Sequence, residues 1–495
     1  MTRPPLPPSF VARLRQQLGG AAADAVASAL AEPPAQGLRA NPRHGGAADI
    51  AARRGWTATP VPWCPEGAVL APAGAGRHPA GRHPWHEGGA YYLQDPTAMG
   101  VVPLLDPRPG DLVLDLAAAP GGKATHIAGR LGDHGLLWAH DATPVRADAL
   151  LNNLERWGAT VAVVSQGDPG RLAGLAGRFD RVLVDAPCSG EGMFGKSDAA
   201  RERWSPALVH ACTRLQGALL DLAADLVRPG GVLVYATCTL GPEEDEGAIE
   251  RLLSRRPDLV PESLHLQRRR PSGSAPGGGP TGDACARWWP AKGAGDGHFA
   301  ARLRRLEPAG GPPAVARARP VGRGGRGPAA RRPADRVPTP AERSTWRAFA
   351  DAVLGGDPLP AHELVVTDDR LLAVPPAALA LPAAWRRAGV PLGRIAEGRD
   401  GRRRFEPHHA LSRALPQAGA AGARIDLAAD DPRVFAYLRG EPLSLPGVDG
   451  WGLVRAEGVP LGWVKGRRAE LNNHYPRGLR RDLRREPTTA DDDLG

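Results

Sequence analysis

The sequence predicts an α/β fold built around a doubly wound parallel sheet over residues 91 to 306. Three observations predict it. Short apolar runs alternate with longer stretches of helical periodicity, a Pro-Gly-Gly turn follows the first run, and acidic or thiol side chains come directly after the runs. Parallel strands with helices on both faces account for all three, because ligands of such sheets bind beyond the carboxyl ends of the strands.

The first run and its turn lie in residues 111 to 130, which read DLVLDLAAAPGGKATHIAGR. Alternating apolar residues at 112 to 116 predict a strand, and the spacing of Ile127 and Leu131 predicts a helix after the glycines. Glycine lets a ligand approach the main chain, and the N–H groups that open a helix lie at the turn. We therefore expect a ligand seat at Ala117, Ala118, Ala119, Pro120, Gly121, Gly122 and Lys123.

The turn lacks the features of phosphate-binding loops. Ala117 stands at the first glycine of a Walker motif and Ala124 at its hydroxyl residue, which disfavours a triphosphate. The dinucleotide pattern G-x-G-x-x-G is absent as well. An adenosyl ligand without phosphates remains, and S-adenosylmethionine, a sulfonium cation, suits an acid-lined mouth. An ordinary corner between a strand and a helix also fits this stretch when it is taken alone.

The strands that follow place polar side chains at one rim of the sheet. An acid that follows a strand often only caps the next helix, but acids at four matching positions favour a ligand site. Asp141, after the second strand, is placed to accept from ribose hydroxyls, and Asp168 from an adenine amino group. The predicted strands are residues 136–140, 161–164, 181–185 and 232–236, and the predicted helices are 145–157 and 206–228. The rim residues are Asp115, Asp141, Asp168, Asp185 and Cys238.

Length and composition limit the class of protein. A chain of 495 residues is expected to form two or three domains, and its net charge of +10 and pI of 9.9 come mainly from arginine. Arginine suits RNA phosphates, although a GC-rich genome would also enrich it. No signal peptide or membrane span is visible, and the five cysteines lack C-x-x-C spacing, so we expect a cytoplasmic protein. We also expect a monomer without a bound metal. The histidines at 78, 83 and 86 fit a solvated loop.

Two cysteines differ from the others because each lies in a loop at a strand end. Cys188 follows Asp185 in DAPCSGEGMF, and Cys238 follows the last strand in YATCT. A buried free cysteine is usually just a small apolar residue, which suits Cys212 and Cys285. A thiolate beside a methyl donor has a chemical use, however, because its addition to carbon 6 of a pyrimidine makes carbon 5 nucleophilic.

These motifs together resemble the NOL1/NOP2/Sun family of RNA cytosine-5 methyltransferases over residues 30 to 305. The matching segments are GLRANPR, YYLQDPTAM, AAAPGGK, DAPCSGEGMF, YATCT and RWWPAKGAGDGHFAA. The resemblance implies a Rossmann-like class I methyltransferase domain that binds S-adenosylmethionine through residues 117–123, Asp141, Asp168 and Asp185. It further implies that Cys238 is the nucleophile, that Asp185 bonds the target cytosine near N3, and that Cys188 assists product release. The departures at Ala117, Ala124 and Ala236 affect no residue with a chemical role.

Other parts of the chain flank this domain. Residues 1–90 are expected to form a small α+β lead-in with a helical stretch at 9–32, residues 307–336 a flexible basic linker, residues 337–420 a mixed connecting segment that begins with a helix at 341–354, and residues 483–495 a disordered tail. Residues 421–482 resemble the PUA-like RNA-binding domain of the bacterial RsmF-like subfamily of 16S ribosomal RNA methyltransferases, with a hairpin turn at Glu457-Gly458.

The C-terminal segment mixes aromatic and basic side chains, a combination that grips RNA by stacking and phosphate contact. We therefore expect an RNA substrate, either 16S rRNA or the 30S particle. Transfer RNA is the nearest alternative, and a non-catalytic ribosome-assembly factor or a small-molecule methyltransferase is a more distant one. The residues concerned are Trp463, Lys465, Arg467, Arg468, His474, Tyr475, Arg477, Arg480 and Arg481.

Overall fold

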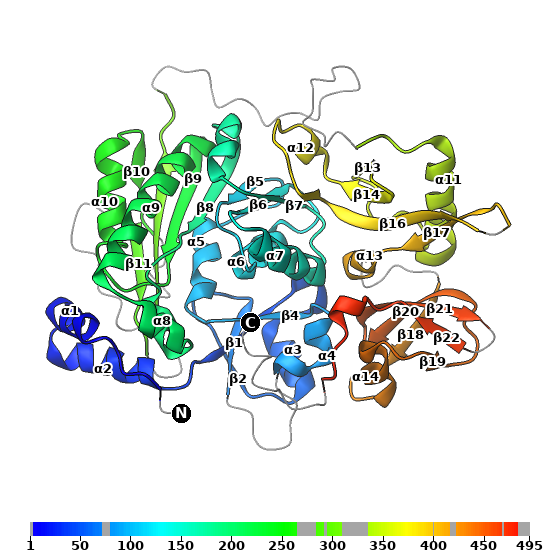
Figure 1. Ribbon diagram of the computed structural model, residues 1–495, viewed down its shortest axis with the longest axis horizontal. Coiled ribbons are helices and arrows are strands. Elements are labelled where there is room, and N and C mark those ends of the chain that lie inside the picture. Colours follow the sequence, from blue (N-terminus) through cyan, green and yellow to red (C-terminus); the bar gives the residue numbers. More distant parts are fainter. Residues whose placement is uncertain are drawn as a thin grey trace.

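A computed structural model describes residues 3–71, 80–264, 284–291, 295–308, 335–398, 400–415, 422–467 and 470–483. The described residues form four β-sheets, and helices cover the largest of them (Figure 1). The predicted basic linker falls mostly, and the predicted tail almost entirely, outside the described residues.

The largest sheet lies in the middle of the chain and has the predicted parallel core. Its strand order is β10-β12-β9-β8-β5-β6-β7-β15, with β11 paired to β12. Strands β9, β8, β5, β6 and β7 are parallel, whereas β12 runs antiparallel to β9. The α/β fold class is thus confirmed. The bounds are β5 Leu112–Asp115, β6 Leu136–Asp141, β7 Ala162–Gln166, β8 Phe179–Asp185, β9 Val227–Thr237, β10 Leu259–Pro261, β11 Cys285–Trp288, β12 His298–Arg305 and β15 Arg387–Ala388.

Helices pack on both faces of this sheet because the central strands are apolar on both sides. Leu114 and Val182 face one hydrophobic cluster, whereas Val113 and Leu183 face another. Ser205 caps the long α9 by accepting a hydrogen bond from the Leu208 amide at 3.2 Å. The helices are α5 Val101–Leu105, α6 Gly122–Leu131, α7 Pro144–Trp157, α8 Asp198–Arg203, α9 Pro206–Leu226 and α10 Glu246–Arg255, with 3-10 turns η3 Ala98–Gly100, η4 Pro169–Leu175 and η5 Glu191–Gly195.

The N-terminal part consists of a helical hairpin and a small antiparallel sheet. The helical stretch expected at 9–32 is confirmed as helical, and Gly19, with a φ of 80°, divides it into α1 Pro8–Leu18 and α2 Gly20–Ala31. The sheet order is β2-β3-β1-β4, so residues 91–94 complete this sheet and not the central one. The bounds are β1 Gln36–Ala40, η1 Pro42–His44, α3 Ala47–Arg54, β2 Ala58–Pro60, β3 Gly67–Leu70, η2 Ala80–Arg82, α4 Pro84–Glu87 and β4 Tyr91–Gln94.

Residues 335–415 form a folded unit that joins the central sheet. Its sheet has the order β13-β14-β16-β17, and its strand β15 pairs antiparallel with β7. Arg386 and Arg387 next to this junction form ion pairs with Asp148 and Glu155 of α7. The bounds are α11 Pro340–Phe349, a π-helical turn Ala350–Leu354, β13 Glu363–Thr367, β14 Arg370–Val374, α12 Pro376–Leu379, β16 Val390–Glu397, β17 Arg403–Pro407 and α13 His409–Ala414.

The C-terminal sheet has the order β18-β20-β21-β22-β19 and packs against the N-terminal sheet (Figure 1). Trp85 of α4 donates its indole N–H to the carbonyl of Ala456 at 3.0 Å, and Arg54 forms an ion pair with Glu457. The predicted hairpin turn at Glu457-Gly458 is confirmed. The bounds are β18 Ala423–Leu427, α14 Pro432–Arg439, β19 Leu443–Ser444, β20 Gly450–Ala456, β21 Val459–Arg467, β22 Glu470–Asn473 and η8 Arg477–Leu479.

Candidate active site

The glycine turn joins β5 to α6 at the carboxyl rim of the central sheet. Gly121 has a φ of 117°, and a Cβ there would lie 3.3 Å from Asn153 and Leu150 of α7, so both conformation and space favour glycine. The Asp141 carboxylate accepts from the Ala119 amide at 3.2 Å, and Arg146 donates to the Ala119 carbonyl at 2.7 Å. The neighbouring strand and helix therefore fix the shape of the turn.

Asp115, the last residue of β5, is a buried acid that the sequence reasoning left without a role. Its side chain is fully buried, and neither carboxylate oxygen reaches hydrogen-bond geometry with a donor among the described residues. Burial, together with the nearby Asp185, raises the pKa of Asp115 to about 8. A cationic ligand at the turn would satisfy this acid, so the site fits a sulfonium cofactor. The position of Asp115 at the end of a strand was the sequence feature that could have indicated this role.

The other two predicted cofactor acids lie further along the rim. Asp141 ends β6, is nearly fully buried, and holds Ala119 and Thr143 through its two oxygens. Asp168 lies beyond β7, is exposed, and caps the η4 turn by accepting from the Gly170 amide at 2.9 Å. Asp168 therefore acts as a helix cap, as acids at strand ends often do, whereas Asp141 holds the backbone of the glycine turn and of the segment before α7.

Asp185 ends β8 and is held by two cationic or polar neighbours. Lys123 of the turn forms an ion pair with Asp185 Oδ2 at 2.7 Å, and His298 Nε2 lies 3.8 Å from Oδ1. Burial alone would raise the pKa of Asp185, but Lys123 and His298 outweigh it and lower the pKa to about 2. Asp185 is therefore a carboxylate at neutral pH, and the structure brings Lys123, predicted for the cofactor, to this predicted catalytic acid.

The two predicted cysteines lie side by side. Cys188 Sγ and Cys238 Sγ are 3.4 Å apart, and both side chains are partly buried. The Gly192 amide donates to the Cys238 carbonyl at 2.8 Å, which ties the two loops together. The hydrogen bond with Cys238, and then burial, raise the pKa of the Cys188 thiol well above its ordinary value. Cys188 is thus suited to remain a thiol that donates to its neighbour.

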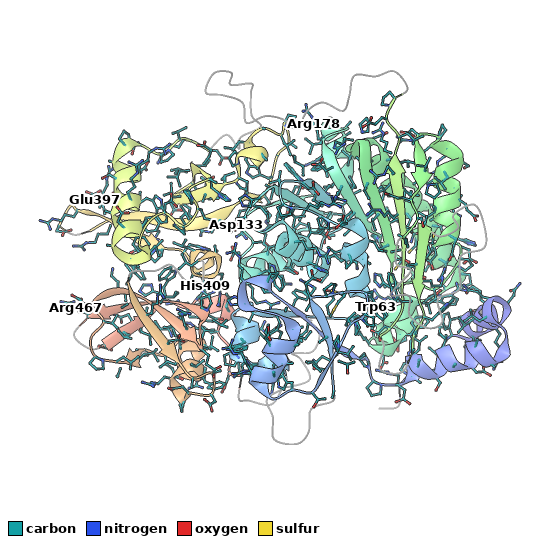
Figure 2. The ribbon with its side chains drawn as sticks, turned by 180° about the vertical axis from the view of Figure 1, so that it is seen from behind. Trp63, Asp133, Arg178, Glu397, His409 and Arg467 are labelled. Atoms are coloured by element: carbon teal, nitrogen blue, oxygen red, sulfur yellow. The ribbon has the colours of Figure 1, made fainter. Side chains whose placement is uncertain are left out.

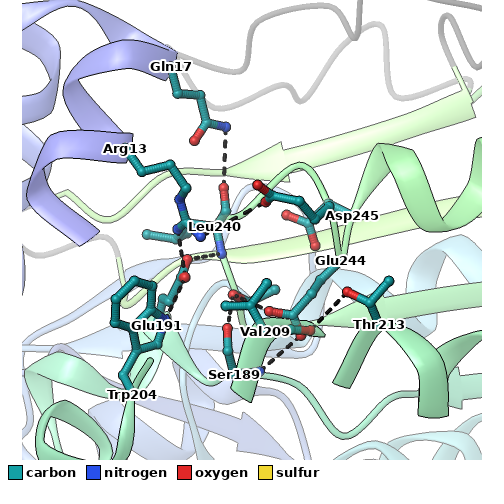
Figure 3. A network of polar contacts seen from close by, with 12 residues as sticks. Arg13, Gln17, Ser189, Glu191, Trp204, Val209, Thr213, Leu240, Glu244 and Asp245 are labelled. Carbon is teal, nitrogen blue, oxygen red and sulfur yellow. Dashed lines mark hydrogen bonds and ion pairs between the residues drawn. The ribbon is translucent and has the colours of Figure 1, made fainter. Parts of the chain in front are cut away.

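Two buried glutamates that the sequence reasoning missed hold these loops (Figure 3). Glu191 accepts from the Leu240 amide at 3.0 Å and from the Trp204 indole at 2.8 Å. Glu244 accepts from the Ser189 amide at 3.0 Å, and burial raises its pKa. The signal was present, because Glu191 lies in the DAPCSGEGMF motif of Cys188 and Glu244 follows Cys238 by six residues, but acids in loops are usually solvated.

A second cluster contains groups that bind metals in other proteins. One ligand atom each from Cys64, Glu66 and His126 lie within 4.8 Å of one another. Arg130 forms an ion pair with Glu66 at 3.0 Å, and Arg39 lies near enough to lower the pKa of His126, so two positive charges oppose a cation here.

The histidines near residue 80 do not form a solvated loop throughout. His78 lies outside the described residues, and His83 caps α4 by accepting from the Trp85 amide at 3.1 Å. The prediction of a solvated loop is wrong for His86, which is largely buried with its ring 5.6 Å from that of Tyr91.

The predicted aromatic and basic set in the C-terminal sheet divides into core and surface. Trp463 and Tyr475 belong to the core, with 1% and 2% of their surface exposed, so their predicted stacking on RNA is wrong. Trp451, which was not predicted, is half-buried, with Lys465 Nζ 5.0 Å and the exposed His474 ring 4.6 Å from its ring centroid. Arg467 lies at the outer edge of this sheet (Figure 2).

None of the helices in the described ranges is both long and apolar enough to cross a membrane.

The fold and the rim define a Rossmann-like methyltransferase. Family profiles match three parts of the chain: 16S rRNA methyltransferase RsmB/F at residues 102–304, the methyltransferase RsmF PUA domain at 424–481, and the RsmF N-terminal domain at 6–96. Ribosomal RNA small subunit methyltransferase F of Klebsiella pneumoniae (strain 342) is 33% identical over 491 residues, which cover 96% of this chain and 97% of that protein. The chain therefore belongs to the ribosomal RNA small subunit methyltransferase F family.

Other relatives are similar over shorter ranges. The protein of the same name from Escherichia coli O9:H4 (strain HS) is 36% identical over 262 residues, or 51% of this chain and 54% of that one. A solved methyltransferase homologue from Pyrococcus horikoshii is 29% identical with a TM-score of 0.52, covering 60% of this chain and 95% of that one. NSun6 from the same organism, solved with SFG, shares the fold at 22% identity, a TM-score of 0.53, and coverage of 61% and 99%.

Proposed function

We propose that this chain is an S-adenosylmethionine-dependent RNA cytosine-5 methyltransferase that acts on 16S rRNA through a covalent adduct of Cys238. The observation that carries the proposal is the pairing of Cys188 and Cys238, 3.4 Å apart, at the rim that also bears Asp185 and Lys123. Membership of the methyltransferase F family supports it. A methyltransferase for another atom would need no pair of thiols beside an ionised acid.

The cofactor seat would be formed by the turn residues 117–123 together with Asp141, Asp168 and Asp185. Bound S-adenosylmethionine supplies an electrophilic methyl group. Asp115 adds an uncompensated acid behind the turn, which suits the positive charge of such a ligand. Asp141 accepts a hydrogen bond from the Ala119 amide of the turn. The remaining lone pairs of its carboxylate could accept from ribose hydroxyls.

The chemical step would begin at Cys238. Its thiolate adds to carbon 6 of the target cytosine, which makes carbon 5 nucleophilic toward a methyl donor. Carbon 5 would then take the methyl group as the bond between that methyl and the donor's sulfonium sulfur breaks, which leaves a neutral thioether. Loss of the carbon 5 proton to water would follow, and the electron pair of that C–H bond would restore the ring double bond as the carbon–sulfur bond to Cys238 breaks. Cys188, whose pKa is raised, can donate its S–H to the Cys238 thiolate before addition and again as it leaves.

Asp185 and Lys123 would divide the recognition of the base. Because its pKa is lowered to about 2, Asp185 is an acceptor and suits the exocyclic amino group of cytosine. Lys123, bonded to Asp185 at 2.7 Å, is the donor of the pair and can stabilise the negative charge that develops toward N3 during thiolate addition. A base must leave its stack to reach these groups, which favours an unpaired loop of the RNA.

The substrate is inferred from the relatives. The relatives from Klebsiella pneumoniae and Escherichia coli carry the name ribosomal RNA small subunit methyltransferase F, and a PUA domain profile matches residues 424–481. Trp451, Lys465 and His474 offer that domain a partly exposed aromatic and basic surface for RNA. Transfer RNA is the alternative substrate of the same chemistry.

The test is methyl transfer to defined RNAs. Purified protein, radiolabelled S-adenosylmethionine and either 16S rRNA, 30S particles or transfer RNA are combined, and bisulfite sequencing locates any 5-methylcytosine. We expect label in 16S rRNA or 30S particles that disappears in Cys238→Ala. Binding of RNA without any transfer would instead indicate an assembly factor, and transfer to transfer RNA alone would replace the substrate.

A further inference from the structure

We infer that Arg13 of the N-terminal helical hairpin is a positioning residue of the active site, because it holds the loops of both cysteines through the buried Glu191. The inference rests on the proposed function and adds to it a role for α1, which lies at the opposite end of the sequence from the RNA-binding domain. Figure 3 shows Arg13 and Gln17 reaching from α1 toward Glu191 and Leu240.

Arg13 contacts the loop of Cys188 through an ion pair with the buried Glu191. Arg13 lies 2.6 Å from Glu191 Oε1, and the Glu191 side chain has 0% of its surface exposed. Glu191 comes three residues after Cys188 and opens the η5 turn. A buried carboxylate requires a compensating charge, and among the described residues Arg13 is the cation paired with it.

The contact to the second cysteine loop passes through Leu240, two residues after Cys238. The other oxygen of Glu191 accepts from the Leu240 amide at 3.0 Å, and Gln17 of α1 donates to the Leu240 carbonyl at 3.2 Å. Helix α1 thus reaches both backbone polar groups of Leu240, the carbonyl through Gln17 and the amide through Glu191, and Arg287 also donates to the carbonyl at 3.1 Å. The spacing between Cys188 and Cys238 depends on where these two loops are held.

Aromatic packing fixes α1 in this position. The Phe10 ring stands edge-on to Phe194 of η5 at 5.0 Å and to Trp204 at 5.9 Å, and the Arg13 guanidinium lies 5.6 Å from the Trp204 ring centroid. Trp204 in turn donates its indole N–H to Glu191 at 2.8 Å. Helix α1, Glu191 and the loop that contains η5 therefore pack together as one unit. Replacement of Arg13 would leave Glu191 buried without its cation.

The chain offers a matched control on the same helix. Arg15 also lies on α1, but it pairs with Asp24 at 3.0 Å on the exposed surface, away from the cysteine loops. Arg13→Ala, Arg13→Lys and Arg15→Ala are compared in the full-length protein. Covalent capture is measured on a denaturing gel with RNA that carries 5-fluorocytidine, whose fluorine blocks the final loss from carbon 5. Cofactor binding and thermal unfolding are measured alongside.

We expect Arg13→Ala to lower kcat and the rate of covalent capture by about a hundredfold, the size of effect that a small displacement of reacting groups produces. Cofactor affinity and the KM for RNA should stay close to those of the unchanged protein, Arg13→Lys should recover part of the rate, and Arg15→Ala should match the unchanged protein. Equal capture rates for Arg13→Ala and Arg15→Ala would overturn the inference.

The capture experiment distinguishes failure of the proposed function from failure of the role of Arg13. Absence of any covalent capture by the unchanged protein would refute the proposed function, whereas capture that is insensitive to Arg13 would refute only the role of α1. If Arg13→Ala does not fold, Glu191→Gln serves instead, because the amide keeps its acceptor oxygen for the Leu240 amide or the Trp204 indole but loses the charge that Arg13 pairs with. A normal capture rate in that folded variant would equally overturn the inference.

Discussion

Replacement of Asp115 by asparagine tests the cofactor seat through stability as well as through binding. The Asp115 carboxyl is fully buried, and within the described ranges no donor lies in hydrogen-bond geometry with it. Its pKa is raised from 3.8 to about 8, chiefly by burial and also by Asp185. The unfolded chain ionises this acid near 3.8, whereas the folded chain resists ionisation until about 8. The folded state therefore loses stability as the pH rises through that window and regains it as the pH falls.

The size of the effect follows from the slope of this linkage, about 1.36 kcal/mol per pH unit inside the window. Between about pH 5 and about pH 7 the unchanged protein should lose about 3 kcal/mol of stability relative to Asp115→Asn. The cost of burying the amide does not depend on pH, so it cancels when the same variant is compared at both values. For a chain of 495 residues that unfolds as one unit, the gap between the two unfolding midpoints should change by about 3 °C.

Binding gives the second measurement. A positively charged cofactor that draws Asp115 into its ionised form should release close to one proton at about pH 7, which calorimetry in buffers of different ionisation enthalpy detects. Asp115→Asn should bind S-adenosylmethionine more weakly and release no such proton. The reasoning fails if the variant shows the same pH dependence of stability as the unchanged protein, or if both release the same number of protons.

The other predictions concern the thiols, the lysine and the RNA surface. Cys238→Ala should bind cofactor normally yet transfer no methyl group, and any retained turnover measured with labelled cofactor would remove it as the nucleophile. Cys188→Ala should accumulate a covalent RNA adduct on a denaturing gel, whereas unchanged activity without an adduct would leave it a packing residue. Lys123→Gln should lower kcat by about a hundredfold, because Asp185 loses its cation and the base its donor, and a normal kcat would exclude both roles. Trp451→Ala should weaken RNA binding by about 1–3 kcal/mol in a filter-binding assay while cofactor affinity stays constant; unchanged RNA affinity would exclude stacking there.

The parallel core could be predicted because each of its strands is a short apolar run that ends in a recognisable polar residue. The same logic placed Asp185, Cys188 and Cys238 in adjacent loops, since β8 and β9 are neighbours in the sheet. Their roles remain predictions. The helical stretch expected at 9–32 is also helical in the structure, but its division at Gly19 was not predicted, because helical periodicity does not show a positive φ.

The errors at Trp463 and Tyr475 have a different cause, which is burial by distant parts of the chain. Tyr475 lies in the cluster between the N-terminal and C-terminal sheets. Strand β21 is buried on both faces over most of its length, so its aromatic residue belongs to the core although basic residues follow it. Local composition could not distinguish this from an exposed stacking surface, because the burial comes from the hydrophobic cluster that β21 shares with Phe349 and Phe405 of the preceding unit. The sequence also gave no signal for β15, a two-residue strand whose pairing with β7 depends on tertiary contact.

The buried acids at the rim differ in a way that argues for the site. Glu191 and Glu244 are each satisfied by donors from the protein, and both brace cysteine loops. Asp115 is as deeply buried as they are, yet no described residue places a donor in hydrogen-bond geometry with it, and it lies where β5 meets the glycine turn. An uncompensated acid inside a protein costs stability, and a chain that supplies donors to its other buried acids could supply one here. We therefore interpret the missing donor as the place of a cationic ligand, which makes the unfavourable burial of Asp115 a property of the unliganded protein that cofactor binding would relieve.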